Sequence, residues 1–286
     1  MYTTNLGGYS GCQVLLCENE DDTAFVRKVS SSLEYNDRLK VQVKKQKEFK
    51  SDSVRTPMVI GDGYTKDGFY YFDMEYIQGI TLAEKIKTIE IGKIRQILDK
   101  IIDGWKIADD RCFADEKINT VKIFHSKIND LSIKLHEREN LILENAIWML
   151  GRHNWSRVTQ SNCHGDLTLE NIIIKDNQLY LIDFLDSFYD SWILDAGTLL
   201  QDALIMWSYR KEAKINNNTL VRLLTFKDIL IDALEAWDER MSLEIYYVLL
   251  LKLVRIYPYT TDELTYAFLN KKISELMLLI RGKENI

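Results

Sequence analysis

The stretch "NCHGDLTLENIIIKDNQLYLIDF", residues 162–184, constrains the fold more than any other part of the chain. Two apolar runs lie on either side of Asp176 and Asn177, a pair that favours the tight turn of a β-hairpin. An antiparallel return would place Asn171, at the start of the first strand, beside Asp183, at the end of the second. The sequence therefore predicts a hairpin that gathers polar side chains at one end.

Those side chains have the chemistry of a metal site. A carboxylate and an amide oxygen at adjacent strand ends suit Mg²⁺, so Asn171 and Asp183 are predicted metal ligands. Asp166 precedes Asn171 by five residues, in the position of a group that orients an attacking hydroxyl and accepts its proton. The fragments are also compatible with a structural role, as a glycine turn with a capping aspartate and a strand that ends in a solvated carboxylate.

The N-terminal region contains candidates for phosphate binding. "LGGYSGCQV" places Gly7, Gly8 and Gly11 between two short strand segments, where backbone N–H groups can approach phosphates closely. Glycine clusters also occur in ordinary hairpin turns. In "AFVRKVS", strand alternation points Lys28 to the same face as Val26 and toward a cleft, where it can pair with phosphates. The alternative is a lysine on the solvent face of the strand.

Hydrophobic periodicity changes along the chain. Residues 1–78 have the pattern of strands and turns with one helix, and residues 79–286 are mainly helical. Strands are expected at 11–18, 24–30 and 69–77, and helices at 35–49, 91–105, 133–151, 220–237, 242–256 and 262–280. We therefore predict an α+β fold with a small antiparallel β-rich lobe, 1–78, and a larger helical lobe, 79–286, that holds the hairpin.

Composition restricts the partners. A net charge of −6 and a pI near 5.4 argue against binding to nucleic acid phosphates, and the most basic stretch, 38–50, is expected to be a solvated helix face. With neither a leader pattern nor a membrane-length apolar run, we expect no membrane contact and a cytoplasmic location. Oligomeric state stays open. The cysteines lack zinc-ligand spacing and are expected to be buried thiols: Cys12, Cys17, Cys112 and Cys163.

"HGDLTLEN" followed by "LIDF", with "GGYSG" and "FVRK" upstream, resembles the aminoglycoside phosphotransferase and choline kinase group, which shares the protein-kinase-like fold. The resemblance covers residues 5–195. It implies a two-lobed small-molecule kinase that moves the γ-phosphoryl group of ATP or GTP, with Mg²⁺, to a hydroxyl of a sugar, an aminoglycoside or an amino alcohol.

The resemblance also implies residue roles. Asp166 resembles the catalytic base, Asn171 and Asp183 the magnesium ligands, Lys28 the lysine that holds the α- and β-phosphates, and His164 the residue that braces the loop. The nucleotide would be bound by the glycine loop and by backbone groups of the segment between the lobes. These cofactor-binding residues are Gly7, Gly8, Ser10, Gly11, Glu75 and Ile77.

The chain departs from the pattern of related kinases at two points. The helix glutamate that pairs with the lysine has no clear equivalent, since Glu48 is the one glutamate of the helix segment and Gln42 lies at a plausible earlier turn. Leu185 replaces the glycine of DFG, and nothing resembles a phosphorylated activation loop, which argues against protein-kinase activity. Asp195 resembles an aspartate with a structural role.

The acceptor stays open in the sequence. Three acids near the predicted cleft favour a cationic acceptor or are simply solvent-exposed: Glu170, Asp186 and Asp190. Four aromatic residues can stack on a sugar or an amine, or belong to the core: Phe188, Tyr189, Trp192 and Trp207. A nucleotide-binding pseudokinase or scaffold of the same fold is the alternative to an enzyme.

Overall fold

The computed structural model describes residues 2–7, 12–21, 23–110, 119–212 and 214–284. The chain divides into two compact units, Met1–Lys85 with Cys163–Phe188 and Ile86–Asn162 with Tyr189–Ile286. The first is rich in antiparallel strands and the second is helical, which confirms the predicted α+β class. The division does not coincide with the expected boundary between residues 78 and 79, because the hairpin groups with the N-terminal strands.

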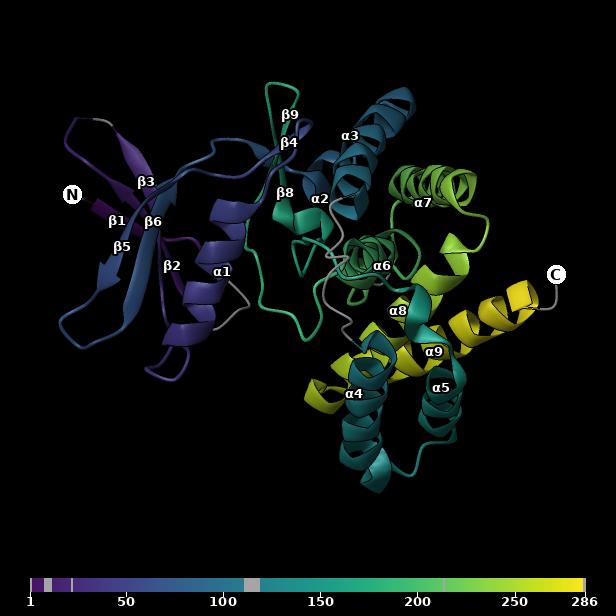
Figure 1. The fold of residues 1–286 in the computed structure, drawn as a ribbon. Helices are drawn as coiled ribbons and strands as arrows, with labels where there is room; N and C mark the ends of the chain where they lie inside the picture. The colour runs from purple at the N-terminus through teal and green to yellow at the C-terminus, as the bar shows by residue number, and fades with distance from the viewer. Residues whose placement is uncertain (1, 8–11, 22, 111–118, 213, 285–286) are drawn as a thin grey trace. The chain divides into compact units, whose positions relative to one another are not determined.

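A five-stranded antiparallel sheet forms most of the first unit, in the order β1-β2-β3-β6-β5. Helix α1 (Asn36–Glu48) lies along this sheet (Figure 1) and buries Leu39 and Val43 against Phe72. The strands are β1 (Tyr2–Asn5), β2 (Gln13–Glu18), β3 (Ala24–Val29), β5 (Val59–Tyr64) and β6 (Tyr70–Glu75). Strand β5 was not predicted, since Gly61 and Gly63 interrupt its apolar pattern.

The predicted hairpin is present as β8 (Ile172–Lys175) and β9 (Gln178–Leu181). Its turn residues Asp176 and Asn177 have φ values of 49° and 63°, as a two-residue type I′ turn requires. The hairpin belongs to a second sheet in the first unit, in the order β4-β9-β8-β7. The other strands are β4 (Val54–Arg55) and β7 (Ile80–Thr81), and the short helix α2 (Leu82–Lys85) follows β7.

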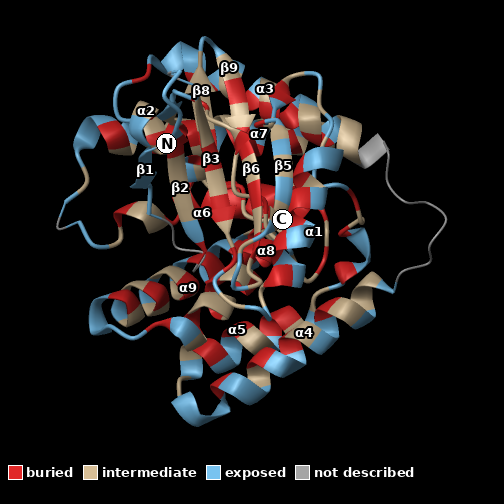
Figure 2. Ribbon diagram, turned by 90° about the vertical axis from the view of Figure 1, so that its left-hand side faces the viewer, coloured by how far each residue is buried: buried red, intermediate tan, exposed pale blue. Residues whose placement is uncertain are grey.

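Helices α6 and α8 form the centre of the second unit, and Figure 2 shows buried residues concentrated around them. The helices of this unit are α3 (Ile91–Asp110), α4 (Thr120–Leu135), α5 (Leu141–Arg152), α6 (Trp192–Ala203), α7 (Asn217–Trp237), α8 (Met241–Ile256) and α9 (Glu263–Glu284). Single 3₁₀ turns are η1 (His136–Arg138), η2 (Trp155–Arg157), η4 (Trp207–Tyr209) and η5 (Tyr257–Tyr259). Each residue of α6 is buried, its polar residues included, and the helix was not predicted.

The prediction of one helix over 133–151 is wrong, because two helices meet in that range, although its end near Gly151 agrees with the end of α5. Helix α4 ends at Leu135, and Glu139 adopts a left-handed conformation with a φ of 43°. The Asn140 side chain then accepts hydrogen bonds from the N–H groups of Ile142 and Leu143 and caps α5. A capping asparagine inside an apolar pattern is the local signal that separates the two helices.

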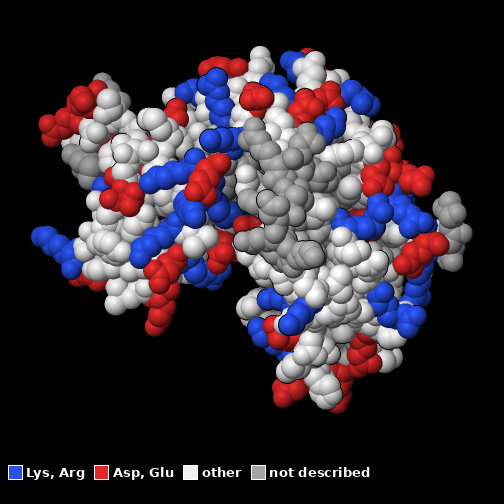
Figure 3. Space-filling view, in the orientation of Figure 1, with Lys and Arg blue, Asp and Glu red and all other residues white. Residues whose placement is uncertain are grey.

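The outer face of α1 is charged, as expected for a solvated face. Lys40 pairs with Asp37, Lys44 with Glu48 and Lys47 with Asp62. Basic and acidic side chains are interspersed on the face shown in Figure 3. Among the described helices, none combines the length and the apolar character needed to cross a membrane.

Candidate active site

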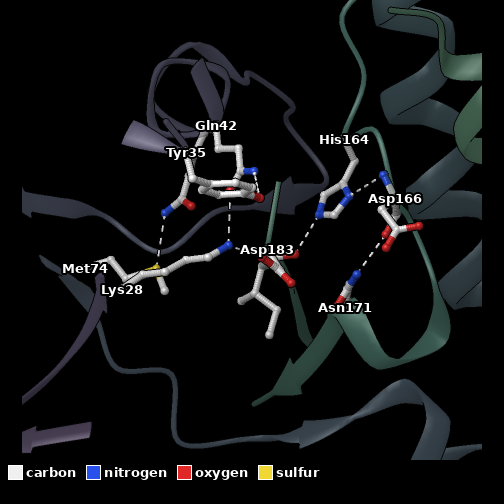
Figure 4. A network of polar contacts seen from close by, with 10 residues as sticks. Lys28, Tyr35, Gln42, Met74, His164, Asp166, Asn171 and Asp183 are labelled. Carbon is white, nitrogen blue, oxygen red and sulfur yellow. Dashed lines mark hydrogen bonds and ion pairs between the residues drawn. The ribbon is translucent and has the colours of Figure 1, made fainter. Parts of the chain in front are cut away.

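The hairpin brings the two predicted metal ligands together. The turn η3 (Leu169–Asn171) leads into β8, and the Ile182 N–H donates to the Asn171 carbonyl oxygen at 3.0 Å. Asp183 follows Ile182 directly, with a φ of 61° that turns the chain away from β9. Residues twelve positions apart in the chain therefore present their side chains at the same end of the hairpin (Figure 4).

Both predicted ligands keep one oxygen available. Asn171 Nδ2 donates to the Asp166 carbonyl oxygen at 2.8 Å, which leaves Asn171 Oδ1 without a hydrogen bond from a described residue. Asp183 Oδ1 pairs with Lys28, while Oδ2 takes none from the described chain, and the side chain is 35% exposed. Two hard oxygens next to the paired ends of β8 and β9 fit a Mg²⁺ ion.

The donor set is small. Within the described residues, no group of three or more His, Cys, Asp or Glu side chains is arranged to hold a metal. An ion held by Asn171 and Asp183 would therefore complete its shell with water and phosphate oxygens. Mg²⁺ is bound in this way in phosphoryl-transfer sites, because it loses its water reluctantly.

His164 holds the loop from inside the protein. Its side chain is 0% exposed and packs on the Phe184 ring at 4.4 Å between centroids. Nδ1 accepts from the Asp166 N–H at 3.2 Å, so Nε2–H donates to the Ile182 carbonyl oxygen at 2.6 Å. Burial lowers the pKa of His164 to about 4, and the ring is neutral near pH 7.

The backbone of Asp166 is held on both sides. Its carbonyl oxygen accepts from the Thr168 N–H at 2.9 Å as well as from Asn171. Gly165, directly before it, has a φ of 93°, and a Cβ there would lie 2.4 Å from the Leu185 carbonyl oxygen. Only glycine fits at this position. Asp166 thus projects from a loop with little freedom to move.

Lys28 is buried, not solvent-facing, so the alternative interpretation of this strand lysine is wrong. It is 3% exposed; its ammonium donates to Gln42 Oε1 at 3.1 Å and pairs with Asp183 (Figure 4). Gln42 Nε2 in turn donates to the Tyr35 hydroxyl at 3.0 Å. Glu48 lies on the exposed face of α1, so Gln42 is the helix partner of Lys28.

The predicted nucleotide-binding residues are only partly described. Gly7 has a φ of 73°, and its N–H donates to Asn5 Oδ1 at 2.9 Å. Gly8, Ser10 and Gly11 lie outside the described residues. Glu75 ends β6 and its N–H donates to the Met58 carbonyl oxygen at 2.9 Å, and Ile77 is 5% exposed. The adenine contacts of Glu75 and Ile77 stay a prediction.

Sequence reasoning missed three residues around this site: Tyr35, Lys45 and Gln46. Gln46 is buried and donates to the Pro57 carbonyl oxygen at 2.9 Å, and Lys45 donates to the Leu185 carbonyl oxygen at 2.8 Å. The signal was their spacing, since positions three and four residues after Gln42 lie on its side of the helix. Because lysines surround these residues, this side of the helix was predicted to be a solvated face.

Two of the aromatic residues considered for acceptor binding belong to the core. Trp192 is 0% exposed and stacks on Trp105 and Trp237, with centroids 5.6 and 4.7 Å away. The buried Tyr189 hydroxyl donates to the Val158 carbonyl oxygen at 3.0 Å. Asp195 is also buried, in the first turn of α6. Glu170 and Asp186 are exposed.

Comparisons with known proteins bear on the fold of the chain. A model of a phosphotransferase enzyme family matches residues 109–224, and no curated protein matches the chain in sequence. The apo structure of a thermostable mutant of aminoglycoside phosphotransferase APH(4)-Ia has a TM-score of 0.63 at 12% identity, and covers 99% of this chain and 95% of its own. Amicoumacin kinase hAmiN, in complex with AMP-PNP, Ca²⁺ and Ami, has a TM-score of 0.61 at 14% identity, with 96% and 87% covered.

A third similar structure is a further variant of the same APH(4)-Ia mutant, in a ternary complex with ADP and hygromycin B. Its TM-score is 0.63 at 12% identity, and 98% of this chain and 93% of that chain are covered. Similarity at this level establishes the fold. The chain has the protein-kinase-like fold of these small-molecule kinases, and its resemblance to the aminoglycoside phosphotransferase group is confirmed.

Proposed function

We propose that the chain is a phosphotransferase that moves the γ-phosphoryl group of ATP or GTP to a hydroxyl of a small molecule. The observation that carries the proposal is the convergence, within the first unit, of a buried lysine, two side-chain oxygens that are available to a metal ion, and a loop carboxylate. Similar structures hold ADP with hygromycin B and AMP-PNP with Ami, which supports a nucleotide donor and a small-molecule acceptor.

Lys28 would bind the phosphates of the donor. An ammonium group has three N–H donors, and Gln42 and Asp183 take two of them. The third is left for a phosphate oxygen. Because Lys28 is buried, its charge acts on the phosphates with little screening by water. The side chain is also held in place before the nucleotide arrives.

Asn171 Oδ1 and Asp183 Oδ2 would hold Mg²⁺, which when bound supplies positive charge that neutralises the phosphoryl oxygens. The hydrogen bond from Asn171 Nδ2 to the Asp166 carbonyl oxygen fixes the amide so that its oxygen points to the other side. The Asp183 carboxylate pairs with Lys28 through Oδ1 and would hold the ion with Oδ2. The chain thus ties the lysine and the metal ligand into one network.

Asp166 would act on the acceptor. Its carboxylate orients the hydroxyl and accepts its proton as the oxygen forms a bond to the γ-phosphorus. The bond from that phosphorus to the β,γ-bridging oxygen breaks, and the nucleoside diphosphate leaves. The rigid loop around Asp166 supports this role, because the reaction depends mainly on positioning.

A nucleotide-binding scaffold is the second candidate, and one observation favours it. Lys28 is held by the neutral amide of Gln42 instead of a carboxylate, so the usual charged pair is absent at this point of the described helix. Both candidates predict nucleotide binding. Only the enzyme predicts transfer.

A panel of acceptors separates the two. Sugars, aminoglycosides and amino alcohols are incubated with the protein, ATP or GTP, and either Mg²⁺ or EDTA. The enzyme predicts nucleoside diphosphate release that requires both Mg²⁺ and one acceptor class, with a phosphorylated product visible by ³¹P NMR. Nucleotide binding without acceptor-dependent release across the panel would favour the scaffold.

A further inference from the structure

Lys45 reaches from α1 into the loops that flank the proposed site. Its ammonium donates to the Leu185 carbonyl oxygen at 2.8 Å and to Ser187 Oγ at 3.3 Å. It also lies 3.5 Å from Cys163 Sγ. These partners belong to two stretches, the one that leads to Asp166 and the one that follows Asp183.

The two stretches meet at Leu185. Its N–H donates to the His164 carbonyl oxygen at 3.0 Å, and its carbonyl oxygen lies against Gly165, where a Cβ would be 2.4 Å away. Lys45 Nζ is 3.4 Å from the same Cβ position. A lysine with three donors therefore lies where the loop of Asp166 touches the loop after Asp183.

The residue at this junction differs from that of related kinases. Leu185 stands where the DFG motif has glycine, so its backbone is more restricted. Lys45 then holds its carbonyl oxygen in a single position. Asp183, two residues earlier, is in the left-handed conformation and depends on the path of the following chain. A fixed Leu185 backbone therefore also fixes the path of the chain directly after Asp183.

We propose that Lys45 is a positioning residue, which holds the Asp166 loop and the loop after Asp183 in one arrangement. The role rests on the proposed phosphoryl transfer for its kinetic consequence. Lys45 needs no contact with the substrates. Its effect on the rate passes through the two loops, and its effect on loop order is independent of the reaction.

The first measurement is hydrogen exchange without any substrate. Lys45→Met is compared with the parent and with Lys44→Met, whose lysine is on the same helix but 72% exposed. In Lys45→Met, peptides that cover 163–166 and 185–187 should exchange about tenfold faster, while peptides from β2 and β3 keep their rates. Unchanged exchange in both loops would overturn the proposal.

The second measurement is steady-state kinetics with the acceptor found in the panel. Lys45→Met should lower kcat about tenfold and change the nucleotide KM less than about threefold, and Lys45→Arg should restore most of kcat. Lys44→Met should behave as the parent. A parent-like kcat in Lys45→Met would contradict the positioning role. A parent without any transfer would instead contradict the proposed function, and the exchange measurement would still decide whether Lys45 clamps the loops.

Discussion

A neutral imidazole is built into the loop at residue 164. His164 donates from one ring nitrogen and accepts with the other, so a second proton would break the bond from the Asp166 N–H. Burial lowers its pKa to about 4, whereas the unfolded chain has a value near 6.5. Between these values the unfolded state binds more protons than the folded state. Stability is therefore complete above pH 6.5 and is lost as the pH falls toward 4.

Because of His164 alone, we expect the free energy of unfolding to fall by about 2 kcal/mol when the pH is lowered from 7.5 to 5. Urea titrations of the parent and of His164→Asn at both pH values measure it, because the variant lacks the titrating group. The fall in stability should be about 2 kcal/mol smaller in the variant. An identical fall in both proteins would mean that His164 is not held neutral.

Gly165 is the second residue on which the loop depends. A side chain there would adopt a left-handed conformation and meet the Leu185 carbonyl oxygen. Gly165→Ala should lower the free energy of unfolding by about 2 kcal/mol or more. Gly92→Ala is the matched control, since a Cβ there meets nothing within 4 Å and the change, in the first turn of α3, should leave the free energy of unfolding equal or slightly higher. Urea denaturation of both variants measures their free energies of unfolding. If Gly165→Ala and Gly92→Ala changed this free energy equally, the steric explanation for Gly165 would be contradicted.

At the scale of an element, helix α1 contributes more to the site than its charged sequence indicates. Its inner face combines the core residues Leu39 and Val43 with buried Gln42 and Gln46. This inner face packs on the sheet and binds Lys28 through Gln42, while Lys45 reaches the Leu185 carbonyl oxygen in the loop after Asp183. Helix and lysine can therefore be expected to act as one unit in catalysis.

Gln42→Ala should lower kcat/KM about tenfold, because Lys28 loses the acceptor that orients it. Gln42→Glu supplies a carboxylate at the same place and should remain within about threefold of the parent. Glu48→Gln is the control, since Glu48 is 64% exposed and pairs only with Lys44 among the described residues. If Glu48→Gln lowered kcat/KM as much as Gln42→Ala does, Gln42 would not be the helix partner that orients Lys28.

Elements with a clear turn pair or charge pattern were the ones that the sequence predicted well. The hairpin follows from Asp176-Asn177 between apolar runs, and α1 from its charge pattern. The break between α4 and α5 depends on one capping side chain, and α6 is buried on all sides. Apolar residues recur at helical spacing on both sides of the break, so periodicity did not separate α4 from α5, and α6 was not expected.

At the scale of the whole molecule, the sequence predicted Asp166, Asn171, Asp183 and Lys28 as site residues, because each belongs to a motif with a fixed order, and their roles stay a prediction. It did not distinguish Gln42 from Glu48, since that choice depends on the rotation of α1 against the sheet. It also did not predict Lys45, whose partners lie more than a hundred residues away in the chain. Tertiary packing decides both cases.

Asp166→Asn tests the central claim most directly. The change keeps the size of the side chain and removes the group that accepts the proton. Acceptor-dependent phosphoryl transfer should fall about a thousandfold, while the nucleotide Kd changes less than about threefold. Glu170→Gln, at an exposed acid in the same loop, should transfer at the parent rate. Equal transfer rates in Asp166→Asn and the parent would contradict the account.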